Sequence, residues 1–551
     1  MHEGIDTTLY LEPLKYYNYF LKDKHQENID KCLDEFVKKV GFSIEENKET
    51  VDAYNKMLTK SLMFEKNIRK KRGFATFLLI IGIILCPIIV GIFLLIYRAN
   101  KIKPQIAGME EEKGKIDAEK ARLLNHAKAQ TQPLLDQIDD EAALRLAEET
   151  APILDFDERC EPERIQQMVD QFGLVEDEFD NHSTLVVQSG DIVGNPFILT
   201  QTYVMDLLPK TYTGTLVIHW TTTVHTDKGT RTVHHTQTLV AHHTEDAPNY
   251  SVQTKLMLAS DAAPKLSFER APAGLAGKSE KEVDRYVQKF ERKDEKAAEK
   301  AVKKGQNYTK MTNSKFEAYL NSKNRNNEIE YRLLFTPLAQ KNICLMFSQD
   351  KPYGDDITYY KKGCINTLYS GHSRNMDYSG GNYNYASYDY EVIKKKFTDY
   401  NMSFFQGLYY DFLFFLSIPM FQQHTPLPYI PTKPASRNVS SYESECLINK
   451  LEAKKFAHPD SDTDVILTTK VINKGKDVDN IHVVAHTFKA ISKVKYVPTM
   501  GGDGRTHPVP VPYYIYEPLE RETPMVIYKN AVPKGKEGII MKYRNLYLAN
   551  K

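Results

Sequence analysis

The chain has 551 residues, 73 Lys and Arg against 72 Asp and Glu, a formal net charge of +1, and 41% hydrophobic residues. The even charge balance gives no reason to expect a nucleic acid partner, and the apolar content excludes a disordered chain. Six cysteines without a CxxC pair predict no disulfide framework, although Cys344 and Cys364 are able to pair in an oxidising compartment. One Trp against 34 Tyr, with many Asn and Lys, is typical of a low-GC bacterial protein.

Residues 1–72 are predicted to be a helical N-terminal region with helices at 13–40 and 43–72. The first helix has one apolar stripe, and Gly41 is expected to end it. Ser43 and Glu46 predict a capping box at the start of the second. The second helix ends in a basic cluster, which we expect to meet anionic lipid headgroups: Lys66, Arg69, Lys70, Lys71 and Arg72.

Residues 73–97 form an uncharged stretch, GFATFLLIIGIILCPIIVGIFLLIY. About 20 apolar residues are needed to cross a bilayer, so the stretch predicts one transmembrane helix in the cell membrane. Positive charge is denser on its N-terminal side, which favours a cytoplasmic N-terminus and an external C-terminal bulk. Pro87 kinks a helix, and the alternative is a shallow hairpin with both basic flanks in the cytoplasm.

Residues 98–150 are predicted to form a helical stalk. Met109, Ile116 and Leu123 recur every seven residues, but Lys113 and Lys120 occupy the intervening positions of a coiled-coil core. The stalk is therefore expected to be solvated, or to pack against the helices of 13–72. A homo-oligomer through the N-terminal helices or the stalk stays open as an alternative.

Residues 151–276 are predicted to be a β-rich domain. Its clearest element is a hairpin of 215–226 and 230–241, closed by the three-residue loop Asp227-Lys228-Gly229. This register pairs Trp220, Ile218 and Leu216 with Thr236, Thr238 and Val240, respectively. It also places His219 and His235 on one face as candidate metal ligands. Two imidazoles fall short of a tetrahedral site, so we expect neither a metal nor a cofactor.

A sequence similar to a phosphate-binding loop follows a predicted strand at 266–270. Pro272 stands where GxxxxGK[ST] requires its first Gly, and proline has no amide hydrogen to donate to a phosphate. Ser279 and Glu282 instead predict the capping box of a charged helix within the segment 277–312. We therefore expect no nucleotide site.

Residues 313–424 are predicted to be a mixed α+β domain, with a strand at 329–335. A helix at 390–417 is expected to be buried, although Gln406 and Asp411 interrupt its apolar end. The loop before it is rich in Tyr, Gly and Asn and is a candidate binding surface, because Tyr offers contact area and a hydroxyl group. Its tyrosines are Tyr378, Tyr383, Tyr385, Tyr388 and Tyr390.

A Pro-rich connector is predicted at 425–445. Residues 446–551 are expected to be β-rich, with strands at 465–471 and 481–488. Beside the glycine loop 501–504 stand Asp503, Arg505 and His507, the polar trio that we would examine for chemistry.

The sequence thus predicts a multidomain α+β protein with N-terminal helices, one transmembrane helix, a stalk, and β-rich and mixed α/β globular regions. The function expected is that of a membrane-anchored binding or scaffold protein whose partners are the lipid bilayer and another protein or a surface polymer. No complete catalytic motif is present, which makes an enzyme the less favoured class. The alternatives are a membrane-tethered hydrolase with a site scattered over strand ends, and a cytoplasm-facing membrane-hairpin protein.

Overall fold

The computed structural model divides the chain into two compact units. Unit 1 comprises residues 1–18, 152–378 and 407–551, and unit 2 comprises 19–151 and 379–406. The structure describes 11–529 except 86–88, 140, 161, 176–179, 227–228, 306–307, 309, 351–352, 379 and 424–438, and the strand backbones 541–543 and 546–550. The whole is a mixed α+β protein with two antiparallel sheets.

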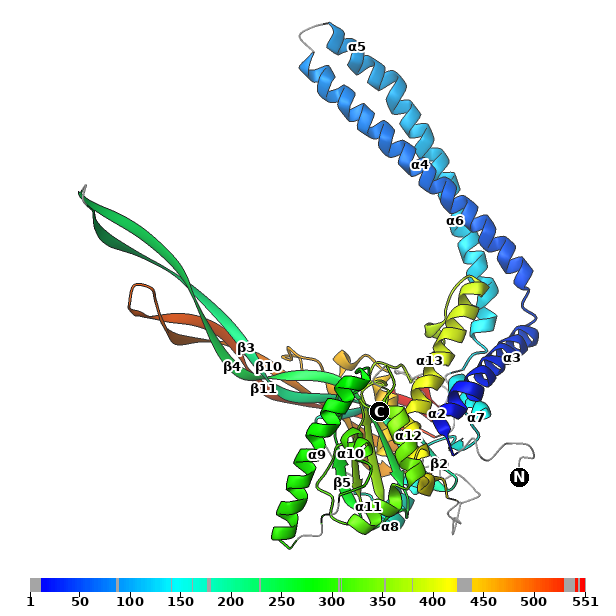
Figure 1. Cartoon of the computed structure of the whole chain (residues 1–551). Coiled ribbons are helices and arrows are strands. Elements are labelled where there is room, and N and C mark those ends of the chain that lie inside the picture. The colour runs from blue at the N-terminus through cyan, green and yellow to red at the C-terminus, as the bar shows by residue number, and fades with distance from the viewer. Residues whose placement is uncertain are drawn as a thin grey trace. The chain divides into compact units, whose positions relative to one another are not determined.

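Unit 2 is helical, and its longest feature is an arm of antiparallel helices (Figure 1). α4 (Ile44–Ile84) runs outward, and the chain returns through α5 (Val90–Tyr97), the π-helix η2 (Arg98–Ile102) and α6 (Lys103–Leu135). α3 (Lys22–Val40) precedes the arm and α7 (Ala142–Thr150) follows it. As predicted, Gly41 caps α3 in the left-handed conformation. Of the capping box predicted for α4, the structure shows the Ser43 side chain accepting from the backbone amide of Glu46.

The expectation of one continuous helix across 73–97 is wrong, because α4 ends at Ile84 and α5, which begins at Val90, packs beside α4. Gly82 allows the two limbs to approach closely: a Cβ atom there would lie 2.8 Å from a methyl carbon of Leu95. In the part of the chain that the structure describes, no helix has both the length and the apolar character needed to cross a bilayer. The predicted stalk is the returning limb of the arm, so it packs against α4 rather than standing alone.

The base of unit 2 has its own apolar core. The predicted stripe of α3 is buried there through Ile29 and Leu33, which are at most 1% exposed, with Phe36 and Val40 at its margin. The rest of this core comes from α6, α7, α13 and the loop residues Ile138 and Tyr385. Its members are Leu134, Leu135, Ile138, Ala142, Leu146, Tyr385, Tyr390, Ile393 and Phe397.

Unit 1 contains an eight-stranded antiparallel sheet in the order β1-β2-β3-β4-β8-β7-β5-β6. Its strands are β1 (Leu154–Phe156), β2 (His182–Ile192), β3 (Asn195–Thr226), β4 (Gly229–Ala259), β5 (Ser267–Arg270), β6 (Ser322–Lys323), β7 (Thr358–Lys362) and β8 (Ile365–Ser370). The regions predicted separately as 151–276 and 313–424 therefore contribute strands to one sheet.

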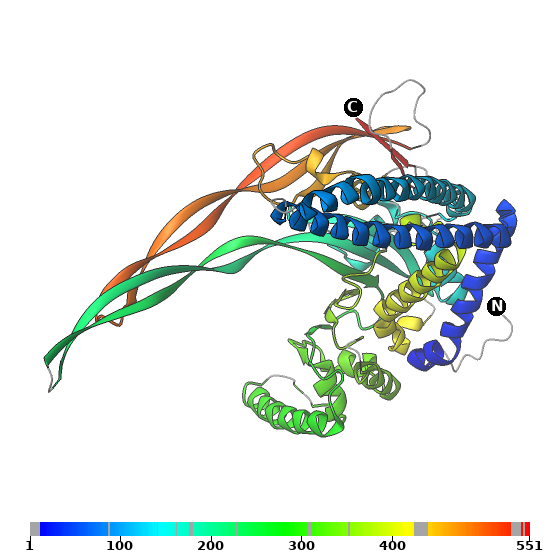
Figure 2. The same ribbon diagram turned by 90° about the horizontal axis from the view of Figure 1, so that it is seen from above.

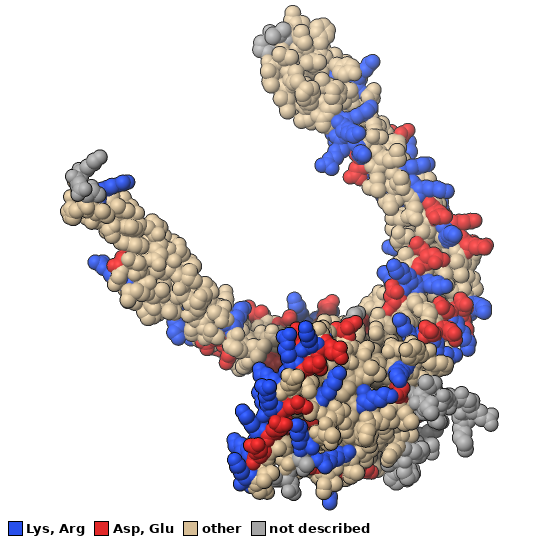
Figure 3. Space-filling view, in the orientation of Figure 1, with Lys and Arg blue, Asp and Glu red and all other residues tan. Residues whose placement is uncertain are grey.

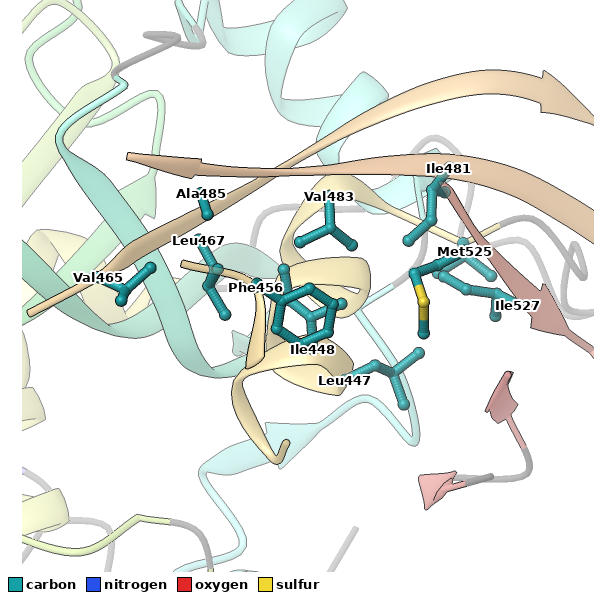
Figure 4. Close-up of a cluster of buried hydrophobic side chains, with 11 residues drawn as sticks. Leu447, Ile448, Phe456, Val465, Leu467, Ile481, Val483, Ala485, Met525 and Ile527 are labelled. Carbon is teal, nitrogen blue, oxygen red and sulfur yellow. The ribbon is translucent and has the colours of Figure 1, made fainter. Parts of the chain in front are cut away.

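The second sheet of unit 1 has the order β12-β13-β11-β10-β9. Its strands are β9 (Ile466–Lys474), β10 (Val478–Met500), β11 (Thr506–Tyr528), β12 (Met541–Tyr543) and β13 (Leu546–Asn550). α14 (Ser441–Asn449) packs Leu447 and Ile448 under this sheet, against Val483, Met525 and other apolar side chains (Figure 4). The predicted connector 425–445 lies largely outside the described residues.

Two long β-ribbons, β3–β4 and β10–β11, extend together from these sheets (Figures 1 and 2). Val509 and Val511 of the second ribbon pack on Ile218, Leu239 and Ala241 of the first. Gly214 permits this contact, because a Cβ atom there would lie 2.1 Å from the backbone oxygen of Pro510. Each two-stranded ribbon thereby buries one apolar face against the other ribbon.

The predicted register of the first ribbon is wrong by one residue. Thr226 pairs with Gly229, so Leu216, Ile218 and Trp220 pair with Leu239, Gln237 and His235, respectively. A shift of one residue moves a strand's side chains to the other face. The observed register places Leu239 and Ala241 beside Ile218, where the second ribbon covers them.

The remaining helices of unit 1 are α2 (Pro13–Tyr16), α8 (Pro162–Phe172), α9 (Glu280–Lys303), α10 (Ser314–Leu320), α11 (Glu328–Leu334) and α12 (Pro337–Phe347). The predicted strand at 329–335 is α11, whose start is capped by the Asn327 side chain. The predicted capping box of Ser279 and Glu282 is present at α9. α13 (Tyr390–Leu416) begins in unit 2 and ends in unit 1, where its apolar end is buried as predicted. Cys344 and Cys364 are free thiols.

Candidate functional site

The end of the helical arm carries an unusual concentration of exposed apolar side chains. Eleven large apolar residues between 74 and 97 are 47–72% exposed: Phe74, Phe77, Ile80, Ile83, Ile84, Ile89, Val90, Ile92, Phe93, Ile96 and Tyr97. A small apolar cluster around Ala75, Leu78 and Ile102 is buried between the limbs. We call the described residues of 73–97 the apolar tip. Large contiguous apolar patches on a protein surface mark contacts with proteins or membranes.

Basic residues border the apolar tip on both limbs, and we call them the basic collar: Arg69, Lys70, Lys71 and Arg72 on α4, and Arg98, Lys101 and Lys103 on the returning limb. The space-filling view shows Lys and Arg gathered below an end of the arm where the described residues carry no charge (Figure 3). The sequence analysis favoured a single span with basic flanks at its opposite ends and gave a hairpin with both flanks on one side as the alternative. The hairpin brings them to one level.

Polar contacts fix the two limbs in register near the collar. Arg98 Nε donates to the backbone oxygen of Ala75 at 2.9 Å, and Lys71 Nζ donates to Gln105 Oε1 at 2.8 Å. Farther along the arm, the Ser61 hydroxyl donates to Asp117 Oδ1 at 2.6 Å. These contacts hold the apolar tip as a hairpin rather than an open helix.

Unit 1 contains a buried polar cluster that the sequence analysis missed. His372 Nδ1 lies 3.2 Å from Asp356 Oδ1, and His372 Nε2 lies 3.1 Å from Asp411 Oδ1. Asp411 also accepts hydrogen bonds from the hydroxyls of Ser370, Ser373 and Tyr378. The signal available in the sequence was Asp411 itself, a single carboxylate within a very apolar helical segment. A buried carboxylate needs partners, and these residues supply them.

The cluster has the residue types of a hydrolytic site but lacks access. The His372 side chain is 3% exposed and that of Asp411 is fully buried. Burial by itself would lower the pKa of His372, but Asp411 and Asp356 raise it to about 10. A protonated imidazole enclosed by two carboxylates has no free nitrogen for general-base catalysis. We therefore interpret the cluster as structural.

The loop similar to a phosphate-binding loop binds a carboxylate of the protein itself. The backbone amides of Ala273, Leu275 and Ala276 donate to the Asp355 carboxylate at 2.6–3.1 Å. The buried Arg270 guanidinium donates to the same carboxylate at 2.8 Å. Burial lowers the pKa of Arg270 to about 10, against the attraction of Asp355. An anion from the chain therefore occupies the place that a phosphate would take in a nucleotide-binding loop.

The candidate metal ligands His219 and His235 lie on opposite faces of the first ribbon. His219 pairs with Thr236, while His235 pairs with Trp220 and stacks on its ring at 5.1 Å. Each imidazole instead contacts a threonine hydroxyl, His219 that of Thr236 and His235 that of Thr222. Across the described residues, no group of three or more His, Cys, Asp or Glu side chains is arranged to hold a metal ion.

The tyrosine-rich loop presents less surface than its composition indicates. Tyr378, Tyr385 and Tyr390 are 1–6% exposed, and Tyr388 is half-buried. Tyr383, at 64%, is the one member of the five that is mostly exposed. Tyr385 packs on Phe397 in the core of unit 2, which explains its burial.

The polar trio lies at the turn between β10 and β11. The Asp503 carboxylate accepts from the backbone amide of Arg505 at 3.0 Å and lies 2.9 Å from His507 Nε2. The Arg505 amide, with His507, holds the pKa of Asp503 below its usual range. Gly502 donates its amide to Gln237 on the first ribbon. The trio therefore stabilises a turn and its contact with the other ribbon.

No protein-family model, curated protein or solved structure matches this chain.

The outer face of the second ribbon bears an apolar strip that sequence reasoning did not identify. Val494, Tyr496 and Tyr514 are 44–66% exposed, and the pairing of Tyr496 with Pro510 and of Val494 with Pro512 adds two prolines to the same face. The alternation of Pro and Val along 508–512 was visible in the sequence. Which of the two faces the first ribbon would cover was not.

Proposed function

We propose that the chain is a membrane-anchored scaffold or binding protein whose apolar tip inserts into one leaflet of a bilayer. The observation that carries this proposal is the set of eleven exposed large apolar side chains at the apolar tip, bordered by the basic collar. The limb of α4 from Gly73 to Ile84 is about 18 Å long at 1.5 Å per residue. Half of a hydrocarbon core of about 30 Å is about 15 Å, so the limb matches one leaflet.

The energetics support insertion. Burying one large apolar side chain contributes about 1.5–3 kcal/mol. With eleven such side chains roughly half exposed in water, lipid contact contributes on the order of 10 kcal/mol. Each basic residue near an anionic surface adds about 1 kcal/mol. The helices satisfy their own backbone hydrogen bonds, which membrane insertion requires.

A hairpin returns both of its flanks to the same side of the membrane. We therefore propose a hairpin with both flanks and the rest of the chain on the cytoplasmic side, rather than a single pass with an external C-terminal bulk. Positive flanks remain preferentially in the cytoplasm, and here both flanks are positive.

Unit 1 is the part that we propose is presented to a partner, another protein or a surface polymer. The strip of Val494, Tyr496 and Tyr514 supports this role, because tyrosine is enriched in binding surfaces and this strip is exposed. The hydrolase alternative has less support, since His372 and Asp411, the centre of the polar cluster in unit 1, are buried.

Flotation with lipid vesicles tests insertion. We expect the full chain to float with vesicles of phosphatidylcholine and phosphatidylglycerol, and the double variant Ile83→Glu, Phe93→Glu to remain in the aqueous fraction. Each charge in a bilayer core costs about 2.5–3.5 kcal/mol, so each of the two substitutions should lower the partition coefficient at least about 50-fold. Both wild-type side chains are more than half exposed, so the fold has little reason to change.

The matched control is Thr59→Glu with Asn55→Glu, two exposed positions of α4 away from the apolar tip. This variant should float like the wild type. Flotation of the Ile83→Glu, Phe93→Glu variant at the wild-type level would overturn the proposal.

A second measurement separates a hairpin from a single span. In a cysteine-free background, Asn67→Cys and Asn100→Cys place one thiol on each flank. A membrane-impermeant maleimide added outside sealed vesicles should label both thiols equally when the protein is added from outside. Labelling of one flank only would show a span.

A further inference from the structure

A groove runs along one side of the arm, between α4 and α6 and below the basic collar. It has a volume of about 770 Å³. Apolar side chains from both helices line its floor: Met57, Met63, Phe64 and Ile116. Met63 is 61% exposed, and the other three are half-buried. A two-helix arm leaves such a face uncovered because only the opposing stripes of its helices meet.

The charged residues at the margins of the groove are arranged by helix. Lys60 stands on the α4 margin, whereas Glu112, Lys115 and Glu119 stand on the α6 margin. Lys115 pairs with Glu111 of its own helix at 2.7 Å, which leaves the two glutamates as the outward charges of that margin. The contact between Ser61 and Asp117 places Lys60 between these two glutamates along the arm, closer to Glu119. Glu119 also pairs with Arg122 of its own helix, an exposed contact of small energetic value.

This arrangement is complementary to itself. When two such arms lie face to face, pointing the same way and related by a twofold axis along them, α4 of one copy faces α6 of the other. Lys60 of each copy then meets Glu112 and Glu119 of its partner, at two equivalent places. The apolar floors meet between them, which is the packing of a four-helix bundle.

We propose that the occupant of this groove is a second copy of the chain, and that two arms pair side by side as a four-helix bundle. The common direction of the two arms rests on the proposed function, since two apolar tips in one leaflet must point the same way. The groove and its charges do not depend on the membrane.

Charge exchange between two copies tests the pairing. One copy carries Lys60→Glu, and the other carries Glu112→Lys with Glu119→Lys. Each variant alone places like charges at both contacts, whereas the mixed pair restores attraction at both. The full chains, in nonionic detergent, are measured by sedimentation and by co-purification through different tags.

We expect the wild type to sediment as a dimer, each variant alone to dissociate at least tenfold more readily, and the mixture to recover dimers. Lys66→Glu, an exposed position outside the groove, is the control and should dimerise normally. Circular dichroism should show unchanged helix content in every variant.

A monomeric wild type, or variants that dimerise alone as the wild type does, would overturn the pairing. Failure of the mixture to recover dimers would also overturn it. Failed flotation with successful charge exchange would contradict the membrane function and leave the pairing in place, so the two proposals fail separately.

Discussion

His372 Nε2 lies 3.1 Å from Asp411 Oδ1 in the interior of unit 1, while Asp356 holds the other ring nitrogen. Burial favours the neutral imidazole, and the two carboxylates outweigh it, so the pKa of His372 rises to about 10. The interior of unit 1 therefore contains an imidazolium at neutral pH. This charge ties α13, through Asp411, to the segment that follows β8.

The stability of the protein should depend on this proton. The pKa of this histidine is higher in the folded state, about 10, than in the unfolded state, near 6.5. Its contribution to the free energy of unfolding is therefore complete below pH 6.5 and is lost as the pH rises toward 10. We expect the thermal unfolding midpoint of the wild type, relative to His372→Gln, to fall progressively from pH 6.5 to 10. The difference at pH 6.5 should correspond to a few kcal/mol, measured by calorimetry.

The comparison with His372→Gln is needed because Lys361 titrates in the same range with the opposite sign. Burial lowers the pKa of Lys361 to about 8, so Lys361 raises the free energy of unfolding as the pH increases from 8 to 10.5. Subtracting the two curves removes this term. A difference that stays constant from pH 6.5 to 10 would contradict the assignment of an imidazolium.

Asp355 should be essential to the fold of unit 1. Asp355→Ala leaves Arg270 buried without its carboxylate and removes the acceptor of three backbone amides. Breaking a buried ion pair by removing one partner costs about 3–5 kcal/mol. We expect a loss of this size in chemical unfolding. Asp350→Ala, a nearby acidic position outside this loop's hydrogen bonds, should cost much less.

The same contact predicts no response to nucleotides. Because Asp355 occupies the amides of the loop, millimolar ATP with Mg²⁺ should leave the thermal unfolding midpoint of the wild type unchanged. A clear rise would show that a phosphate displaces the carboxylate.

The sequence was sufficient for features set by local chemistry. Gly41 and Ser43 marked the boundary of two helices, and Ser279 marked the start of α9. Each depends on a few neighbouring residues, so no distant contact can reverse it.

Features set by distant contacts were beyond the sequence. The apolar composition of 73–97 predicts affinity for an apolar environment. It does not specify the hairpin in which Gly82 and Leu95 come into contact. The register at Thr226 and Gly229 follows from which face the second ribbon covers. The partners of Asp411 come from residues 33–41 positions away, which only the fold brings together.

The stacking of the two ribbons depends on Gly214. A Cβ atom there would lie 2.1 Å from the Pro510 oxygen, so Gly214→Ala must push the ribbons apart, at a cost of about 1–3 kcal/mol. Trp220, the only tryptophan of the chain, lies against Gly502 of the second ribbon and reports on this separation. We expect its fluorescence to shift to longer wavelength. Gly108→Ala, whose Cβ atom meets nothing within 4 Å, should leave it unchanged.

The basic collar should set the preference for anionic lipid. Arg69→Gln with Lys70→Gln removes two exposed charges next to the apolar tip without touching the contacts that hold the limbs together. At about 1 kcal/mol for each charge, binding to vesicles containing phosphatidylglycerol should weaken roughly 30-fold. Binding to vesicles of phosphatidylcholine alone should change little, because the apolar contribution is intact.

The matched control for the collar is Lys38→Gln with Lys39→Gln, which removes the same charge from the end of α3. Its affinity for both vesicle types should stay near that of the wild type. Ionic strength gives a second check, since exposed charges are screened over about 10 Å at 0.1 M salt. Raising salt should therefore erase the difference between the Arg69→Gln, Lys70→Gln variant and the wild type. A difference of the same size on neutral vesicles, or one that persists in high salt, would show that these residues act through the fold of the arm rather than through lipid charge.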